Sequence, residues 1–376
     1  MIKNINIQNF KSIKEASIEL SYLNLFTGVN ASGKSTFLQS LLLLRQSYLA
    51  GFLTRRNKVL FLGNKDKETL INLGTFKDVL YENAEKDENL VIGFEDNEPF
   101  NLNFSCVTAN SDNKGETTIG GNLKTNAHDL DMIPLFSDNF QYLAADRIAP
   151  QEYYPRFEGN ELLGKDGAFT AHFLEKYGYK PISIKSLKHE RTQGDIDTLI
   201  GQVNYWMQDI SPNINIKTKE NSTNIELSYR YIGENGLYTA QDRKPQNVGY
   251  GITTTLPILV AILAAKPGDI IIIENPETHI HPKGQSKLVE LMALAAESGV
   301  QLMIETQSDH FINGLLVAIR KQQIKADNTK IYYFDRNEQQ NTRITNIPVS
   351  KDSRIRNPPI GFFDQITNDR KFLMGF

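Results

Sequence analysis

"GVNASGKS", residues Gly28 to Ser35, decides the fold of this chain. The stretch fits the pattern G-x-x-x-x-G-K-[ST] at every position and follows the apolar run "YLNLFTG", which predicts a buried strand. Four consecutive leucines, Leu41 to Leu44, come next and predict a helix that is buried on most sides. A glycine turn between a strand and a helix N-terminus presents backbone N–H groups to an anion, so the sequence predicts a phosphate-binding P-loop.

Two side chains of the predicted P-loop have separate tasks. Lys34 offers a positive charge to the terminal phosphates of a nucleotide, and Ser35 offers a hydroxyl to Mg²⁺. The residues expected to contact the nucleotide here are Gly28, Asn30, Ala31, Ser32, Gly33, Lys34, Ser35 and Thr36.

The composition is that of an ordinary globular protein. The 376 residues allow one large domain with an insertion or two closely joined lobes. The formal net charge of -3 gives no reason to infer nucleic-acid binding, although a local basic face stays open. The chain has a single cysteine and no signal-peptide pattern. Its longest apolar stretch, Leu256 to Ala265, is too short to cross a bilayer. We therefore expect a cytoplasmic protein without a membrane segment.

The order of the predicted elements indicates an α/β fold. Residues 1–150 are expected to hold the P-loop and an antiparallel β lobe, because short alternating segments follow the helix. Residues 151–245 predict a mainly helical lobe. In residues 246–376, buried strands and helices alternate before a C-terminal hairpin, which favours a right-handed parallel arrangement. We therefore expect a mixed sheet in a single P-loop head.

A second motif supplies the carboxylate that a P-loop needs. In "IIIIENPETHIHP" the apolar run Ile270 to Ile273 ends in Glu274, which places an acid at the carboxyl edge of the predicted sheet. Mg²⁺ and phosphate are expected at this edge, so Glu274 is the predicted metal-binding and catalytic acid. A strand-end glutamate on the surface is the simpler alternative.

These motifs together resemble a known group of proteins. Four segments are similar, in order and spacing, to segments of ABC-type ATPases of the RecF/SMC and OLD group. They are "NFKSIKEASIELSYLNLFTGVNASGKST", "NVGYGITTTLPIL", "IIIIENPETHIHP" and "IETQSDHFINGLLVAI". The nearest likeness is to stand-alone prokaryotic AAA-type ATPases that carry a C-terminal "GFFDQ" element, here Gly361 to Gln365. Many such relatives belong to antiphage defence or DNA-processing operons.

The resemblance implies a shared nucleotide site. In this group two ATP molecules lie between two head-to-tail subunits, and each site takes a P-loop from one chain and a signature motif from the other. The segment that matches the signature contains Asn247, Gly249 and Gly251. Two glycines before a helix can present N–H groups to a γ-phosphate, although the same pattern often marks only a turn.

The sequence departs from the family pattern at two positions. Asn275 stands where the resemblance implies the catalytic carboxylate, and an amide cannot act as a general base. Glu277 is the nearest replacement, either as a base that orients water or as a cap of the turn. Gln307 stands where a switch histidine is implied, so it can hydrogen-bond a γ-phosphate but cannot change charge. Slow or partner-dependent hydrolysis is the expected consequence.

Two upstream residues also fit the resemblance, and two features of related proteins are not predicted here. Gln141 resembles the Q-loop glutamine that contacts Mg²⁺, and Arg147 is a candidate contact of phosphate or of an interface carboxylate; both also suit a strand-end surface. Too few residues follow "ETQSDH" for the nuclease domain of OLD proteins, and no heptad array predicts the coiled-coil arm of SMC proteins.

The hypothesis from the sequence is a Mg-ATP-binding, slowly hydrolysing ATPase that forms a homodimer or a higher homo-oligomer. The resemblance implies that it controls a separate effector, a nuclease or toxin, in a defence module. One alternative is an ATP-sensing scaffold without hydrolysis. Another is a RecF-like ATPase that clamps DNA, for which the basic stretches Arg55 to Lys58 and Lys185 to Arg191 are candidates.

Overall fold

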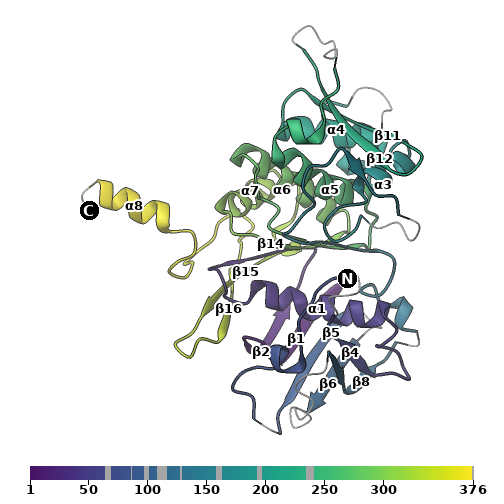
Figure 1. Cartoon of the computed structure of the whole chain (residues 1–376). Coiled ribbons are helices and arrows are strands. Elements are labelled where there is room, and N and C mark those ends of the chain that lie inside the picture. Colours follow the sequence, from purple (N-terminus) through teal and green to yellow (C-terminus); the bar gives the residue numbers. More distant parts are fainter. Residues whose placement is uncertain are drawn as a thin grey trace.

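A computed structural model of the chain describes residues 1–63, 69–85, 87–96, 101–107, 117–127, 129–157, 163–192, 197–233 and 241–374. In Figure 1 the N-terminal part of the chain lies below a central sheet, and the helices of the C-terminal half lie above it. No helix among the described residues is long and apolar enough to cross a membrane.

A six-stranded sheet forms the centre of the molecule. Its strand order is β16-β15-β3-β14-β13-β9, and all neighbours are parallel except the pair β15 and β16. On one side the P-loop strand β3 neighbours β15, and on the other it neighbours β14, which separates it from β13. The strands are β3 (Leu23–Gly28), β9 (Phe140–Leu143), β13 (Ile270–Glu274), β14 (Gln301–Glu305), β15 (Thr329–Arg336) and β16 (Thr342–Asn346).

Both faces of this sheet are buried. Side chains alternate along a strand, so Ile270 and Ile272 of β13 pack into one core while Ile271 and Ile273 pack into the other. All four isoleucines are at most 2% exposed. This explains why the strand is a continuous apolar run, as parallel strands covered on both sides usually are.

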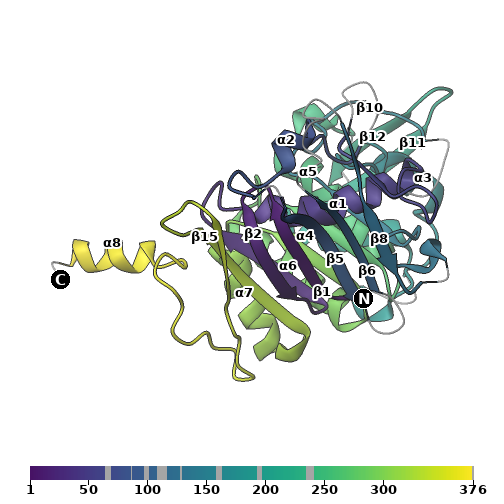
Figure 2. The ribbon, with the colours of Figure 1, turned by 90° about the horizontal axis from the view of Figure 1, so that it is seen from below.

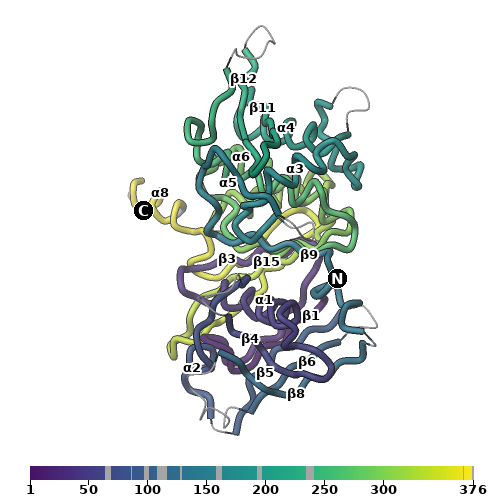
Figure 3. The backbone as a smooth tube through the Cα atoms, turned by 45° about the vertical axis from the view of Figure 1, so that its right-hand side comes forward, coloured from purple at the N-terminus to yellow at the C-terminus, as the bar shows by residue number. Residues whose placement is uncertain are grey.

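The P-loop helix α1 (Lys34–Leu49) lies between two sheets. Figure 3 shows it below the central sheet and above a second, antiparallel sheet, which Figure 2 shows from below. Leu41 to Leu44 are all 0% exposed, because they pack in a core to which strands of both sheets contribute. The second sheet has the order β2-β1-β5-β6-β8, with β1 (Ile2–Phe10), β2 (Ile13–Glu19), β5 (Asn89–Asp96), β6 (Asn101–Val107) and β8 (Asn122–Thr125).

The opposite face of the central sheet is covered by helices. α5 (Tyr250–Ala264), α6 (Pro282–Glu297) and α7 (Asp309–Arg320) pack on it, and α3 (Thr170–Tyr177) and α4 (Leu199–Ile210) lie further out. The region predicted as mainly helical also carries a three-stranded sheet, β10-β12-β11. Its strands are β10 (Tyr153–Tyr154), β11 (Ile214–Glu220) and β12 (Ile225–Tyr231).

The C-terminal segment has two parts. The β15–β16 hairpin, predicted from the sequence, lies beside the P-loop, where Thr342 Oγ1 donates a hydrogen bond to the Ser32 carbonyl at 2.8 Å. Helix α8 (Gln365–Leu373) then stands away from the body of the molecule, as Figure 1 shows in yellow.

One polar stretch is more ordered than its composition indicates. Residues 108–129 are polar and rich in Gly and Asn, a composition that predicts an exposed loop or hairpin tip, but Thr118–Gly120 form strand β7 and Asn122–Thr125 form β8. β7 pairs with β4 (Val59–Phe61), and β8 extends the antiparallel sheet. Pairing with distant strands overrides the local preference of Gly and Asn for turns. Residues 108–116 and 128 lie outside the described part. The short helix α2 (Phe76–Val79) completes this lobe.

Candidate nucleotide site

The P-loop follows β3 directly and ends in the first turn of α1, as the sequence predicts. Gly28 has a φ of +140°, and a Cβ at this position would lie 2.0 Å from the Phe334 carbonyl oxygen. Gly33 has a φ of +105°, and a Cβ there would lie 2.3 Å from Thr342 Oγ1. Glycine is therefore required at both positions, because the loop backbone packs directly against the chain at Phe334 and Thr342.

A cavity of about 530 Å³ opens over the P-loop, within the range of about 300–1,000 Å³ that is usual for small-molecule sites. We call this cavity the cradle. Seven of the eight residues expected to contact the nucleotide from the loop and helix line it: Asn30, Ala31, Ser32, Gly33, Lys34, Ser35 and Thr36. The other lining residues are Lys11, Ser12, Gln39, Asn275, Glu305, Gln307 and Arg336.

Lys34 lies folded over the loop. Its side chain is 4% exposed, and Nζ donates hydrogen bonds to the carbonyl oxygens of Gly28 at 3.0 Å and Val29 at 2.9 Å. Burial lowers the pKa of Lys34, and the carboxylates of Glu305 and Glu277 oppose that effect. A phosphate group can take the place of these carbonyl oxygens, and its negative charge is a stronger partner for the ammonium.

Ser35 contacts an acid that sequence reasoning missed. Its hydroxyl donates to both carboxylate oxygens of Glu305, at 3.1 Å to Oε1 and 2.9 Å to Oε2. Glu305 ends β14 and is 5% exposed. Burial, followed by the neighbouring charge of Glu274, raises the pKa of Glu305 to about 7. The available signal was an acid at the end of the buried strand "VQLMIE", but its importance depends on β14 lying next to the P-loop strand.

Glu274 lies at the expected strand end but faces a different partner. It pairs in register with Glu305 across β13 and β14. One oxygen accepts a hydrogen bond from Tyr142 Oη at 3.1 Å, and the other accepts one from the Ala145 backbone N–H at 3.3 Å. Burial raises the pKa of Glu274, although both hydrogen bonds and the charge of Arg147 act against this. Unlike Glu305, Glu274 does not line the cradle.

Asn275 lines the cradle in the position where the resemblance implies a carboxylate. Its φ of +44° is a left-handed conformation that asparagine tolerates better than most residues. Its backbone N–H donates to the Glu305 carbonyl at 2.8 Å. Its side-chain Oδ1 is buried and has no hydrogen-bond partner among the described residues. A buried amide oxygen of this kind costs free energy unless a ligand or water donates to it.

Glu277 binds the segment that follows β14. Oε2 accepts a hydrogen bond from Thr306 Oγ1 at 2.8 Å, and Oε1 accepts one from the Gln307 backbone N–H at 2.7 Å. Both oxygens are therefore engaged with the turn that positions Gln307, whose side chain lines the cradle. Of the two roles considered for Glu277, this geometry favours the cap of the turn over the water-orienting base.

The signature segment lies apart from the cradle of its own chain. Asn247 and Gly249 are exposed, and they precede the first residue of α5, Tyr250. A Cβ on Gly251 would lie 2.2 Å from the His279 carbonyl oxygen, and the Tyr250 and His279 rings are in contact at 4.7 Å. Asn247, Gly249 and Gly251 are not among the residues that line the cradle of their own chain.

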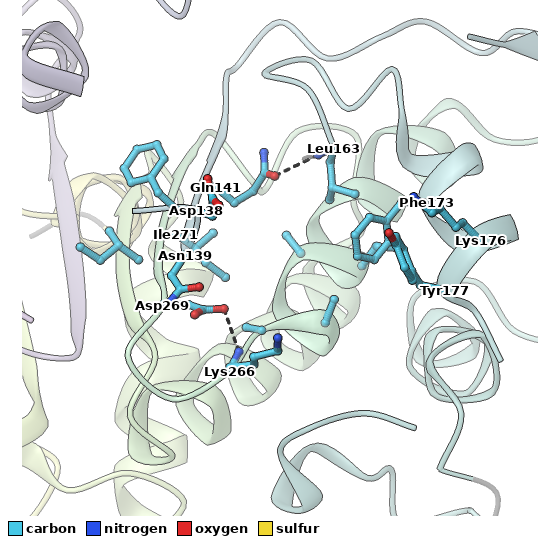
Figure 4. A pocket seen from close by; sticks show the side chains of 16 residues that line it. Asp138, Asn139, Gln141, Leu163, Phe173, Lys176, Tyr177, Lys266, Asp269 and Ile271 are labelled. Carbon is cyan, nitrogen blue, oxygen red and sulfur yellow. Dashed lines mark hydrogen bonds between the residues drawn. The ribbon is translucent and has the colours of Figure 1, made fainter. Parts of the chain in front are cut away.

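Gln141 is not where the resemblance places a metal contact. It lies opposite Ile271 in the register of β9 and β13, well before the strand ends. Its Oε1 accepts a hydrogen bond from the Leu163 backbone N–H at 3.1 Å, as Figure 4 shows, in a separate pocket that Asp269 and Tyr177 also line. The expected metal role of Gln141 is thus at odds with this geometry, because the match rested on chain position alone.

Arg147 supports the turn after β13. Its guanidinium donates to the carbonyl oxygens of Glu274 at 2.7 Å and Asn275 at 2.6 Å. The side chain is 6% exposed, and burial lowers its pKa. These contacts agree with neither the phosphate contact nor the surface position considered from the sequence. Arg147 instead fixes the backbone that carries Glu274 and Asn275.

Three family models match separate parts of the chain. Residues 1–161 match a model described as an AAA ATPase domain, and residues 186–313 match one described as an AAA domain, putative AbiEii toxin, Type IV TA system. Residues 324–372 match a model described as a protein of unknown function (DUF3696). No curated protein matches the sequence.

Solved structures of SMC heads resemble the whole chain. One is an SMC head bound to the C-winged helix domain of ScpA; it has a TM-score of 0.54 and 11% identity, with 92% of this chain and 98% of that chain covered. Another is an SMC head domain with an extended coiled coil, bound to the C-terminal domain of ScpA derived from Pyrococcus furiosus. Its TM-score is 0.52 at 11% identity, with 99% of this chain and 98% of that chain covered.

The chain has the fold of an ABC-type P-loop ATPase. The likeness to SMC heads establishes this fold, and the two AAA models agree with it. The strand order of this ABC-type head places the acids of β13 and β14 at one edge of the sheet, next to the P-loop.

The residues of the cradle suit Mg-ATP. Ser32 Oγ, Thr27 Oγ1 and Asn275 Oδ1 are buried polar atoms without a partner among the described residues, and all three belong to the P-loop region or to the cradle wall. The P-loop opens into a helix N-terminus, whose backbone N–H groups favour a bound phosphate. Mg²⁺ in nucleotide sites usually takes one or two protein ligands and completes its shell with phosphate and water. Ser35 with one carboxylate meets that need.

Proposed function

We propose that this ABC-type head binds Mg-ATP in the cradle and hydrolyses it slowly. The observation that carries the proposal is the cradle itself, in which the buried Lys34 and the hydroxyl of Ser35 stand at a helix N-terminus. When bound, Mg²⁺ would neutralise phosphate charge and would be held by Ser35 and a neighbouring carboxylate. Lys34 would bind the terminal phosphates, and Gln307 would donate to the γ-phosphate.

Slow turnover is expected because position 275, which lines the cradle, carries an amide instead of a carboxylate. Asn275 can hold a water molecule by a hydrogen bond but cannot accept its proton. Glu277 is engaged with Thr306 and Gln307, so it is not placed to act as a base unless this turn rearranges. Hydrolysis that waits for a second chain or a partner protein fits this arrangement.

We further propose that two copies close around ATP. The exposed Asn247 and Gly249 stand at the N-terminus of a helix of fifteen residues, where backbone N–H groups are free to face an anion. Since they do not line their own cradle, a nucleotide bound by a second copy is the natural partner. Loss of the γ-phosphate would remove charge from this contact and weaken the dimer.

Control of a separate effector, a nuclease or toxin in a defence module, is part of the proposal. It is supported by the match of residues 186–313 to a model whose description names a putative toxin of a Type IV toxin–antitoxin system. The projecting helix α8, with Phe372 and Leu373 more than four-fifths exposed, offers such a partner an apolar surface. Co-purification with the product of a neighbouring gene, with and without ATP, tests this step.

The DNA-clamping alternative gains little from the structure. Within the basic stretch Lys185 to Arg191, the Arg191 guanidinium pairs with Asp209 at 2.6 Å, and His189 Nε2 lies 3.0 Å from the same carboxylate. The charge of Arg191 is therefore partly neutralised. DNA binding that weakens steeply with added salt would revive this alternative.

The experiment that tests nucleotide use is an ATP-binding titration and a steady-state turnover assay on the full chain and on Lys34→Ala. Mg-ATP binding and slow phosphate release that are both lost in Lys34→Ala support the proposal. Binding without turnover in the parent protein would leave an ATP-sensing scaffold. Absence of binding in the parent protein would refute the proposed function.

A further inference from the structure

The carboxylate nearest to Ser35 is not the one that the motif pattern indicates. In the sheet, β14 lies between the P-loop strand β3 and the strand β13. An acid at the end of β14 is therefore one strand closer to the P-loop than an acid at the end of β13. Glu305 occupies that closer position, and Glu274 occupies the more distant one.

Hydrogen bonds separate the two acids in the same way. Ser35 Oγ lies 2.9 Å from Glu305 Oε2 and 3.1 Å from Oε1. The oxygens of Glu274 instead accept from Tyr142 Oη and the Ala145 N–H, on the side of the sheet edge away from the P-loop. Glu305 lines the cradle and Glu274 does not.

The contact with Ser35 has a chemical consequence. A serine hydroxyl has one proton to donate and two lone pairs that can accept or ligate. While the proton points to Glu305, the lone pairs stay available for a cation in the cradle. The negative charge of Glu305 then adds to the attraction for that cation, which a neutral residue such as Asn275 cannot do.

We propose that Glu305, rather than Glu274, is the carboxylate that works with Ser35 to hold the Mg²⁺ of Mg-ATP. Glu305 orients the Ser35 hydroxyl and supplies negative charge from the strand next to the P-loop. The inference rests on the proposed function, because it assumes that Mg-ATP binds in the cradle. Glu274, held by Tyr142 and Ala145, then has the task of fixing the turn after β13.

The test compares nucleotide binding with and without the metal. A fluorescent ATP analogue is titrated into the full chain in excess Mg²⁺ and in EDTA, and the ratio of the two dissociation constants gives the gain in affinity due to Mg²⁺. The variants are Glu305→Gln and Glu274→Gln, with the exposed Glu190→Gln as a control for loss of one negative charge. Thermal melting in EDTA verifies that each variant is folded.

We expect Glu305→Gln to lose about 10- to 100-fold of the gain due to Mg²⁺, the range usual for residues that orient metal ligands. Binding in EDTA should be unchanged or tighter, because a negative charge has been removed from beside the phosphates. Glu274→Gln should lose less of the gain, and Glu190→Gln should lose none. The shorter Glu305→Asp, which keeps the charge, should fall between the wild type and Glu305→Gln.

The inference is overturned if Glu305→Gln keeps the wild-type gain, if Glu274→Gln loses more of it, or if Mg²⁺ gives the wild type no gain. Lys34→Ala separates this failure from failure of the proposed function. If the wild type does not bind the analogue, or if Lys34→Ala binds it equally well, ATP does not occupy the cradle. If Lys34→Ala abolishes binding while Glu305→Gln has no effect, only the role of Glu305 is wrong.

Discussion

Replacing Glu305 by glutamine should stabilise the nucleotide-free protein at neutral and alkaline pH. Glu305 is 5% exposed, and its pKa is raised to about 7 by burial and by the charge of Glu274. A carboxyl with a raised pKa resists ionisation in the folded state but not in the unfolded state. Its ionisation therefore destabilises the fold as the pH rises above the unfolded-state value of about 4.5.

The magnitude follows from the pKa. Each pKa unit is worth about 1.4 kcal/mol, so the destabilisation grows between about pH 4.5 and pH 7 and reaches about 3 kcal/mol above that range. Glutamine is neutral at every pH and can still accept the hydrogen bond of Ser35. The gain in stability of Glu305→Gln should thus be about 3 kcal/mol near pH 8 and about 1 kcal/mol or less near pH 5.

Urea denaturation in EDTA measures this difference. The single tryptophan, Trp206, is 4% exposed and reports unfolding by its fluorescence. Glu190→Gln is the matched control, because its side chain is exposed and its effect should be within about 0.5 kcal/mol at both pH values. The electrostatic reasoning is refuted if Glu305→Gln is less stable than the wild type near pH 8, or if its gain is equal at the two pH values.

Three further predictions concern the turn after β13, the signature helix and the core. Glu277→Gln should lower stability by about 1–2 kcal/mol and leave ATP binding intact, since it weakens the contacts with Thr306 and Gln307; a complete loss of steady-state turnover with bound ATP would instead mark Glu277 as the base. Gly251→Ala should cost about 1–3 kcal/mol in a melting assay, because the new Cβ meets the His279 carbonyl; an unchanged melting temperature would contradict that contact. Leu42→Ala should cost about 2–5 kcal/mol in urea denaturation, and a smaller loss would mean that α1 is not enclosed by the two sheets.

The parts of the fold that depend on local signals were predictable from the sequence. The glycine turn between β3 and α1, the leucine-rich helix and the apolar strand β13 each follow from neighbouring residues. The antiparallel pairs β1–β2 and β15–β16 likewise follow from alternation along the chain. Strands β7 and β8 were not predicted, since their stability comes from pairing with distant strands.

The candidate site was predictable only in part, because strand order is not a local property. Glu274 stood out because it ends an apolar run inside a recognisable motif. Glu305 also ends a buried strand, but its contact with Ser35 requires β14 to lie beside β3, which the sequence does not reveal. For Gln141 the sequence suggested a metal contact that the structure does not show. Its register in β9 places it opposite Ile271, and its Oε1 accepts a hydrogen bond from the Leu163 N–H.

The most direct test of the central claim is steady-state phosphate release from Mg-ATP by the full chain, with nucleotide occupancy measured in the same samples. The account predicts slow, Mg²⁺-dependent release, and it predicts that Lys34→Ala loses both binding and release because the ammonium can no longer hold the terminal phosphates. Release that persists in Lys34→Ala, or a wild-type protein that neither binds nor cleaves ATP, would contradict it.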